Sequence, residues 1–147
     1  MSKAASDLTN NIINFIYRQG GYAWRASSVG VFDSKQMHFR AAAKKGVADV
    51  LSCFKGRLVA VEVKIGKDRL SDEQDGFIKN VEKAGGCAFV AADFEQFKIH
   101  WLTYVNPQKC LNCGKNMDPV KDDVAGEITG YLWHCECMPA GTQLSVG

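Results

Sequence analysis

The chain has 147 residues, enough for one domain of ordinary size and a small appendage. Hydrophobic residues make up 46% of it and charged residues 23%, a balance typical of a soluble globular protein. No apolar run approaches the ~18 residues of a membrane-spanning helix, and a net charge of +2 at pH 7 is not in itself the signature of a nucleic-acid-binding protein.

The amino-terminus and the cysteines predict the compartment. The residues after Lys3 contain no apolar core of the kind found in secretory signal peptides. We therefore expect a cytoplasmic protein that does not act at a membrane. Its six cysteines are then expected to be reduced or metal-bound, because the cytoplasm does not favour disulfides.

The positive charge is concentrated in the first third of the chain. Residues 1–48 carry seven Lys or Arg against two Asp or Glu, whereas residues 49–105 carry eight against nine and residues 106–147 three against five. Such a cluster can form the basic rim of a polyphosphate site or simply a solvated loop, and the charges alone do not decide. The candidate phosphate-binding residues are Arg25, Lys35, Arg40, Lys44 and Lys45.

The first predicted element is an amphipathic helix with Ser6 as its N-cap, and Gly20-Gly21 is expected to end it. Its apolar residues recur at helical spacing and are Leu8, Ile12, Ile13, Ile16 and Tyr17. A strand is predicted to begin at residues 22–24. Residues 26–46, rich in Ser, Gly and Lys, predict a loop or a short hairpin.

Two β-rich runs at residues 46–54 and 58–64 flank a turn at residues 55–57 and predict a β-hairpin. Because successive side chains of a strand lie on opposite faces, Glu62 and Lys64 share one face and are roughly 6–7 Å apart. Pairing across the hairpin could bring the carboxylate of Asp49 beside Glu62. Two carboxylates and a lysine on rigid strands suit a divalent cation with a phosphate or water, although a Glu and a Lys on a strand can also form a solvated face.

A helix of about four turns is expected to begin at Ser71. The spacing Ser71-x-x-Gln74 is that of a capping box, in which the two side chains close the first turn of the helix. Gly85-Gly86 ends this helix. The residues that follow predict a buried strand at 87–91, a short helix at 93–97 and a further strand at 99–105.

Taken together, these runs resemble the signature of the PD-(D/E)XK nucleases, in particular the VRR-NUC and phage-type branch, over roughly residues 7–92. The resemblance lies in Gly46-x-x-Asp49, Glu62-x-Lys64 and the flanking runs 22–25, 28–30, 70–74 and 84–90. It implies an α/β fold with a restriction-endonuclease-like mixed β-sheet flanked by helices, as in Holliday-junction resolvases.

The resemblance also implies a metal-dependent endodeoxyribonuclease. Asp49 and Glu62, with the Val63 carbonyl, would bind Mg²⁺ or Mn²⁺, the ions that carboxylates prefer. Lys64 would orient the attacking water or neutralise charge on the phosphate, and Gln74 would orient water or phosphate. Related nucleases often place a further acid on the first helix. Here the candidates are only Asp7, Asn10 and Asn11, which leaves that ligand undefined.

The implied partner is DNA, and we expect a homodimer, because one site per chain needs two copies to cut both strands. The substrate is expected to be a junction, fork or flap, in recombination, repair or phage DNA processing. The alternative is a non-catalytic DNA-binding or assembly module built on a nuclease fold. The retention of all three motif residues, Asp49, Glu62 and Lys64, favours the enzyme.

A second segment is predicted after residues 106–107. Cys110-x-x-Cys113-Gly114 is typical of a zinc knuckle, and Cys135-x-Cys137 is one residue shorter than usual. Four thiolates would form a closed structural Zn²⁺ site, with His134 as a substitute ligand. We therefore expect a nuclease domain at residues 1–105 and a small zinc-ribbon-like segment with a tail at 106–147, stabilised by the metal because it has few large apolar residues.

Overall fold

The computed structural model describes residues 2–26, 31–33, 35, 38–40, 44–110, 112–124, 127–137 and 144–145. The chain forms two compact units, Met1–Phe97 and Lys98–Gly147. Residues 28–30, which carry part of the expected resemblance, lie outside the described residues. In the described ranges, no helix combines the length and the apolar character that crossing a membrane requires.

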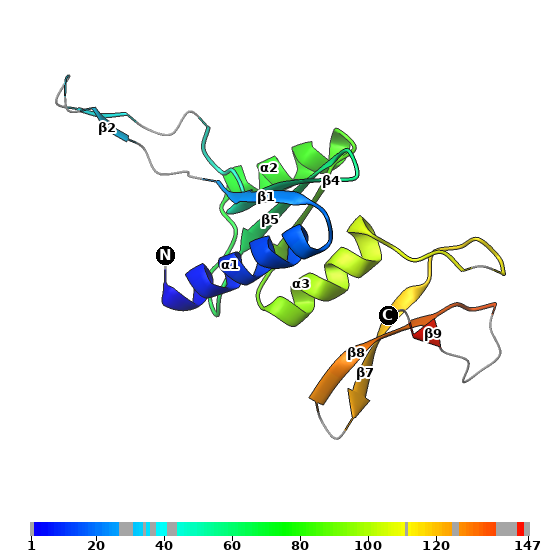
Figure 1. The fold of residues 1–147 in the computed structure, drawn as a ribbon. Coiled ribbons are helices and arrows are strands. Elements are labelled where there is room, and N and C mark those ends of the chain that lie inside the picture. Colours follow the sequence, from blue (N-terminus) through cyan, green and yellow to red (C-terminus); the bar gives the residue numbers. More distant parts are fainter. Residues whose placement is uncertain are drawn as a thin grey trace. The chain divides into compact units, whose positions relative to one another are not determined.

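The first unit is built on a mixed four-stranded sheet with the order β1-β4-β5-β6 (Figure 1). Its strands are β1 (Tyr22–Arg25), β4 (Val50–Phe54), β5 (Arg57–Val63) and β6 (Cys87–Ala91). Neighbours among β1, β4 and β5 are antiparallel, whereas β6 runs parallel to β5 because helix α2 (Asp72–Lys83) crosses between them. A separate hairpin of β2 (Val31–Asp33) and β3 (His38–Arg40) lies in the connection from β1 to β4. The predicted mixed sheet with flanking helices is confirmed.

Helix α1 (Lys3–Arg18) begins one turn earlier than the sequence analysis predicted. Ser2 is the N-cap, and its Oγ accepts a hydrogen bond from the Ala5 N–H at 3.3 Å. Ser6 therefore lies inside the helix. The prediction was wrong because the apolar face continues one turn further, with Ala5 buried as well as Leu8.

The two faces of the sheet are covered by different helices, α1 on one side and α2 on the other (Figure 1). On the α2 side, Ala60 and Ala88 of neighbouring strands pack with Val81 of the helix. Val59 and Val61 point to the opposite face and are fully buried. This alternation is the one predicted for the second run of the hairpin.

The residues after β6 are helical, with α3 (Phe94–His100) followed directly by a π-helical turn η1 (Trp101–Val105). The short helix predicted at 93–97 is confirmed, and its start is closed by Asp93, whose Oδ1 accepts from the Gln96 N–H at 2.8 Å. The strand predicted at 99–105 is wrong. Phe97, Trp101 and Val105 recur at four-residue spacing and are all buried, whereas Ile99 and Thr103 between them are only half-buried, so the burial follows a helical and not a strand pattern.

The second unit contains a three-stranded antiparallel sheet with the order β7-β8-β9. Its strands are β7 (Asp118–Val124), β8 (Glu127–His134) and β9 (Leu144–Ser145), so the predicted tail contributes a strand. The buried cluster of this unit is small and contains two of the four predicted metal ligands. Its members are Cys110, Met117, Trp133 and Cys135, with Leu102 packed against them.

Gly46, the first residue of the motif that leads to Asp49, is required by close packing. Its φ is +76°, and a Cβ at this position would lie 2.4 Å from the carbonyl carbon and oxygen of Glu73 in the first turn of α2. We expect Gly46→Ala to lower the free energy of unfolding by at least about 2 kcal/mol, measured by urea denaturation. The matched control is Gly76→Ala within α2, where a Cβ has open space. It should raise stability by roughly 0.5–1 kcal/mol, and equal effects of the two variants would contradict this explanation.

Candidate functional site

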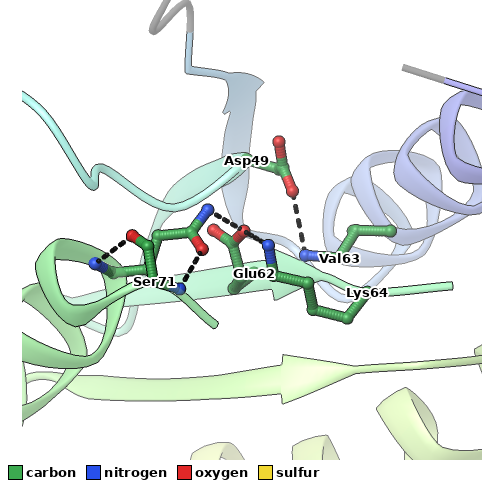
Figure 2. Close-up of polar contacts among 6 residues, drawn as sticks. Asp49, Glu62, Val63, Lys64 and Ser71 are labelled. Carbon is green, nitrogen blue, oxygen red and sulfur yellow. Dashed lines mark hydrogen bonds and ion pairs between the residues drawn. The ribbon is translucent and has the colours of Figure 1, made fainter. Parts of the chain in front are cut away.

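The motif residues meet at the end of the β4–β5 hairpin that lies away from its turn (Figure 2). Val50 pairs with Val61, which places Asp49, just before β4, beside the last residues of β5. The Asp49 Oδ2 accepts a hydrogen bond from the Val63 N–H at 3.0 Å. The structure thus brings the carboxylate of Asp49 to Val63, next to Glu62, as the hairpin predicted.

Glu62 is the buried centre of this group, with only 2% of its surface exposed. Its Oε1 lies 3.1 Å from the Lys64 ammonium and also accepts a hydrogen bond from the Gln74 side-chain amide (Figure 2). Its Oε2 is buried and has no hydrogen-bond partner among the described residues. A buried carboxylate oxygen without a partner is costly. The arrangement therefore offers one open oxygen to a cation, beside a second carboxylate from Asp49.

Glu62 is held in an environment that disfavours its negative charge. Burial raises the pKa of Glu62 above its ordinary value, and the charge of Asp49 raises it further, while Lys64 partly opposes both. An added positive charge would favour the ionised form. The donor set and its electrostatics therefore fit a divalent cation bound by oxygen ligands.

The raised pKa of Glu62 predicts how metal binding depends on pH. Only the ionised carboxylate binds a cation, so Mn²⁺ affinity should fall as the pH is lowered through this pKa, earlier than for a glutamate of ordinary pKa. The stability of the metal-free protein should change with pH in the opposite direction. A pKa that is raised in the folded state means that protonation of Glu62 stabilises the fold, so this contribution grows as the pH is lowered. Calorimetric Mn²⁺ titrations between about pH 5 and 8 test this, and an affinity that is flat across that range would contradict it.

Gln74 combines two contacts through the two ends of its side-chain amide. Its Oε1 accepts from the Ser71 N–H at 3.0 Å and the Ser71 Oγ accepts from the Gln74 N–H at 3.2 Å, which confirms the predicted capping box (Figure 2). Its Nε2 donates to Glu62 Oε1. The start of α2 and the orientation of Glu62 are therefore fixed by the same side chain.

Two substitutions separate these contacts. Gln74→Glu keeps an acceptor for the Ser71 N–H but sets a third carboxylate, after that of Asp49, against Glu62, so Mn²⁺ affinity should change with little loss of helix stability. Ser71→Ala removes the N-cap and should cost about 1 kcal/mol while leaving the amide of Gln74 on Glu62. Thermal melting and Mn²⁺ titration of both variants check this. A Gln74→Glu variant with unchanged Mn²⁺ affinity would show that the contact to Glu62 is only structural.

The predicted DNA-binding residues are not all placed alike. Arg25 lies against α1, where its guanidinium donates to the Ser6 carbonyl at 3.3 Å and to Asn10 Oδ1 at 3.2 Å, on the face of the sheet opposite Glu62. Lys44 lies over the Phe77 ring of α2 at 5.7 Å, and Lys45 is exposed beside it. Lys35 is exposed, and the side chain of Arg40 lies outside the described part of the structure.

The three candidate metal ligands on the first helix differ in their surroundings. Asp7 and Asn11 are exposed on α1, and Asn10 is the hydrogen-bond partner of Arg25. The backbone of Asp49 is held by a contact that the sequence does not predict, in which the Ala26 N–H donates to the Asp49 carbonyl at 2.8 Å. No residue-type pattern signals a backbone contact of this kind.

The four predicted cysteines of the second unit form one cluster. The Sγ atoms of Cys110, Cys113, Cys135 and Cys137 all lie within 4.8 Å of one another, close to the roughly 3.8 Å expected between sulfurs around a tetrahedral metal. His134 is not a member of the cluster among the described residues. These four thiols could hold a metal ion.

The first cysteine pair has the backbone of a metal knuckle. The Gly114 N–H donates to the Cys110 carbonyl at 2.8 Å, and Gly114 has a φ of +72° that suits the tight turn. Hydrogen bonds from the backbone N–H groups of Cys113 and Asn112 lower the pKa of Cys110 to about 6. A thiolate, the form that binds metal, is therefore favoured at this position.

Comparisons with known proteins find similarity among solved structures alone. No protein-family model matches the chain, and no curated protein sequence matches it. Among solved structures, the chain is similar to Hjc, a Holliday junction resolvase from the archaeal hyperthermophile Archaeoglobus fulgidus. The identity is 18%, the match covers 60% of this chain and 67% of that chain, and the TM-score is 0.42. The function therefore has to be inferred from the residues of the site.

Proposed function

We propose that the chain is a Mg²⁺- or Mn²⁺-dependent endodeoxyribonuclease of the PD-(D/E)XK type, of its VRR-NUC or phage-type branch. The observation that carries the proposal is the buried Oε2 of Glu62, which lacks a hydrogen-bond partner among the described residues and lies at the same end of the β4–β5 hairpin as Asp49 and Lys64. Hard divalent ions prefer such carboxylate oxygens.

Asp49, Glu62 and the carbonyl of Val63 would hold the metal. The bound ion would polarise the scissile phosphate and lower the pKa of a water. Lys64 would then place its ammonium near the attacking water or the phosphate, where it neutralises developing charge. The backbone of Lys64 is held in place at the end of β5, because its N–H donates to the Ala91 carbonyl of β6 at 3.0 Å. Gln74 would keep Glu62 in one orientation and, in the bound complex, orient water or phosphate.

DNA would be the substrate, held through its phosphates and not read by sequence. Lys44 and Lys45 are the best candidates for phosphate contacts near the site. Lys44 lies against α2, and the same helix carries Gln74, whose side-chain amide donates to Glu62. Lys35 and Arg40 would extend the contact, and Arg25 would contribute charge from its place beside α1. A homodimer acting on a junction, fork or flap would cut both strands, in recombination, repair or phage DNA processing.

The second unit would bind Zn²⁺ through its four cysteines in a structural role. Two of these cysteines belong to the buried cluster of the unit, so the metal would replace a larger apolar core. Closed coordination by four thiolates leaves no position for a substrate.

Cleavage of labelled DNA tests the proposed activity. Linear duplex, flap, fork and four-way junction are incubated with Mg²⁺ or Mn²⁺ and with wild-type protein, Asp49→Ala or Lys64→Ala. Lys64→Ala should cut about 10²- to 10⁴-fold more slowly and still bind metal. Lys79→Ala, which removes only an exposed pair with Asp75, is the matched control and should cut normally. Binding of DNA without cleavage in either metal would replace the enzyme by a DNA-binding or assembly module.

A further inference from the structure

A row of exposed aromatic side chains follows the edge of the sheet and has no part in the proposed catalytic group. Tyr22 and Trp24 lie on edge strand β1 on either side of the buried Ala23, and Tyr17 of α1 lies beside Tyr22. The ring centroids of Tyr17 and Tyr22 are 5.9 Å apart, and those of Tyr22 and Trp24 are 5.7 Å apart. The three side chains, here called the aromatic row, are 47%, 64% and 42% exposed.

The strand register places Tyr22 and Trp24 on the face of the sheet that carries Glu62. Trp24 pairs with Leu51 and Leu51 with Ala60, so these three residues share one face. Ala60 and Glu62 are two residues apart on β5 and share that face as well. From the usual strand spacing and rise, the Cα atoms of Trp24 and Glu62 are about 12 Å apart. The rings therefore lie within reach of nucleotides next to a phosphate bound at Glu62.

The chemistry of this edge favours a nucleic acid over a second copy of the chain. Residues 17–26 carry two arginines, Arg18 and Arg25, and no acidic residue. The segment therefore has a net positive charge, although the guanidinium of Arg25 itself is held against α1 by Ser6 and Asn10. Exposed rings on a positively charged segment are found in proteins that bind single-stranded nucleic acid, with the bases stacked on the rings and the phosphates attracted by the charge. The three half-exposed rings offer on the order of 300 Å² of surface, far less than the roughly 800 Å² per partner of a stable dimer.

We propose that the aromatic row stacks unpaired bases of the DNA substrate beside the scissile phosphate. Unpaired bases present their flat faces to a protein ring, whereas bases inside a duplex are stacked on one another. The row would therefore select a flap or a fork arm over linear duplex or a fully paired junction. The location beside a scissile phosphate rests on the proposed nuclease function, but stacking can be measured without cleavage.

Tryptophan fluorescence provides that measurement. Trp101 and Trp133 are buried, so Trp24 is the exposed tryptophan, and oligo(dT) added to the full zinc-loaded chain without Mg²⁺ or Mn²⁺ should quench its emission. Labelled oligo(dT) gives affinities for the variants by fluorescence anisotropy. Tyr22→Ala and Trp24→Ala should each bind about 5- to 100-fold more weakly, and Trp24→Phe should retain most of the affinity because it keeps a ring. Tyr104→Ala, an exposed aromatic of the second unit, should bind as the wild type does.

Three outcomes would overturn the stacking proposal. One is oligo(dT) affinity in the Tyr22→Ala/Trp24→Ala double variant equal to that of the wild type. Another is normal cleavage without quenching, which overturns the stacking and leaves the nuclease in place. The third is a wild-type dimer in analytical ultracentrifugation that the double variant dissociates, which would make this edge an interface between copies. Quenching without cleavage of any substrate supports the stacking and overturns the nuclease alone.

Discussion

Glu62→Gln is expected to reduce metal-dependent DNA cleavage by about 10³-fold or more, because the bound metal contributes several kcal/mol of transition-state stabilisation and each ~1.4 kcal/mol is a factor of ten in rate. The same substitution is expected to raise the melting temperature of the metal-free protein. Burial and the charge of Asp49 disfavour the ionised carboxylate, as the raised pKa of Glu62 indicates, and a neutral amide removes that cost.

Opposite effects on activity and stability are what distinguish a metal ligand from an ordinary buried residue. Cleavage assays, and thermal melting of the zinc-loaded protein without Mg²⁺ or Mn²⁺, measure both quantities on the same preparations. Glu82→Gln, at an exposed position on α2, is the matched control and should change neither. A Glu62→Gln variant that melts at a lower temperature without Mg²⁺ or Mn²⁺ and still cleaves would mean that Glu62 is structural, held by Lys64 and Gln74.

Removing zinc is expected to unfold the second unit and leave the first folded. Structural Zn²⁺ in small zinc-binding peptides contributes about 10–16 kcal/mol of apparent binding free energy, more than a small apolar cluster supplies. Cys110 and Cys135 are both ligand candidates and members of the buried cluster, so the metal and the core would be lost together.

Hydrogen exchange read by mass spectrometry, with and without a strong chelator, tests this unit by unit. Peptides from residues 98–137 should lose protection, and those from 44–97 should keep it. Cys110→Ser should lower the bound zinc from about one per chain, while Cys53→Ser, an exposed cysteine of the first unit, should leave it unchanged. Equal protection of residues 98–137 with and without the chelator would contradict a structural zinc site.

The sequence predicts the central geometry because strand alternation is a strict rule. In a β-hairpin the period of two places Glu62 and Lys64 on one face, and strand pairing brings Asp49 to the same end. The cysteine spacing likewise identified the four thiols that gather in the second unit. Local patterns of this kind depend on few residues and are seldom overridden.

Features that depend on tertiary packing were not predicted. The Ile99–Val105 segment is rich in β-branched and aromatic residues, which favours a strand, but in the structure Trp101 and Val105 are buried while Thr103 between them is only half-buried, as a helix places them. The sequence groups Arg25 with the other basic residues that precede Asp49. Because successive side chains of a strand lie on opposite faces, the side chain of Arg25 lies on the α1 face, opposite that of Trp24. The unpartnered Oε2 of Glu62 is visible only once the surroundings of that atom are known.

The central claim is that Asp49 and Glu62 bind a divalent metal, and calorimetric titration of Mn²⁺ into the zinc-loaded chain tests it without a DNA substrate. Wild-type protein is expected to bind Mn²⁺ with a clear heat signal. The Asp49→Asn/Glu62→Gln double variant, with unchanged zinc content, is expected to show none. Equal Mn²⁺ binding by the two proteins would contradict the assignment of these carboxylates as the metal site and, with it, the proposed mechanism.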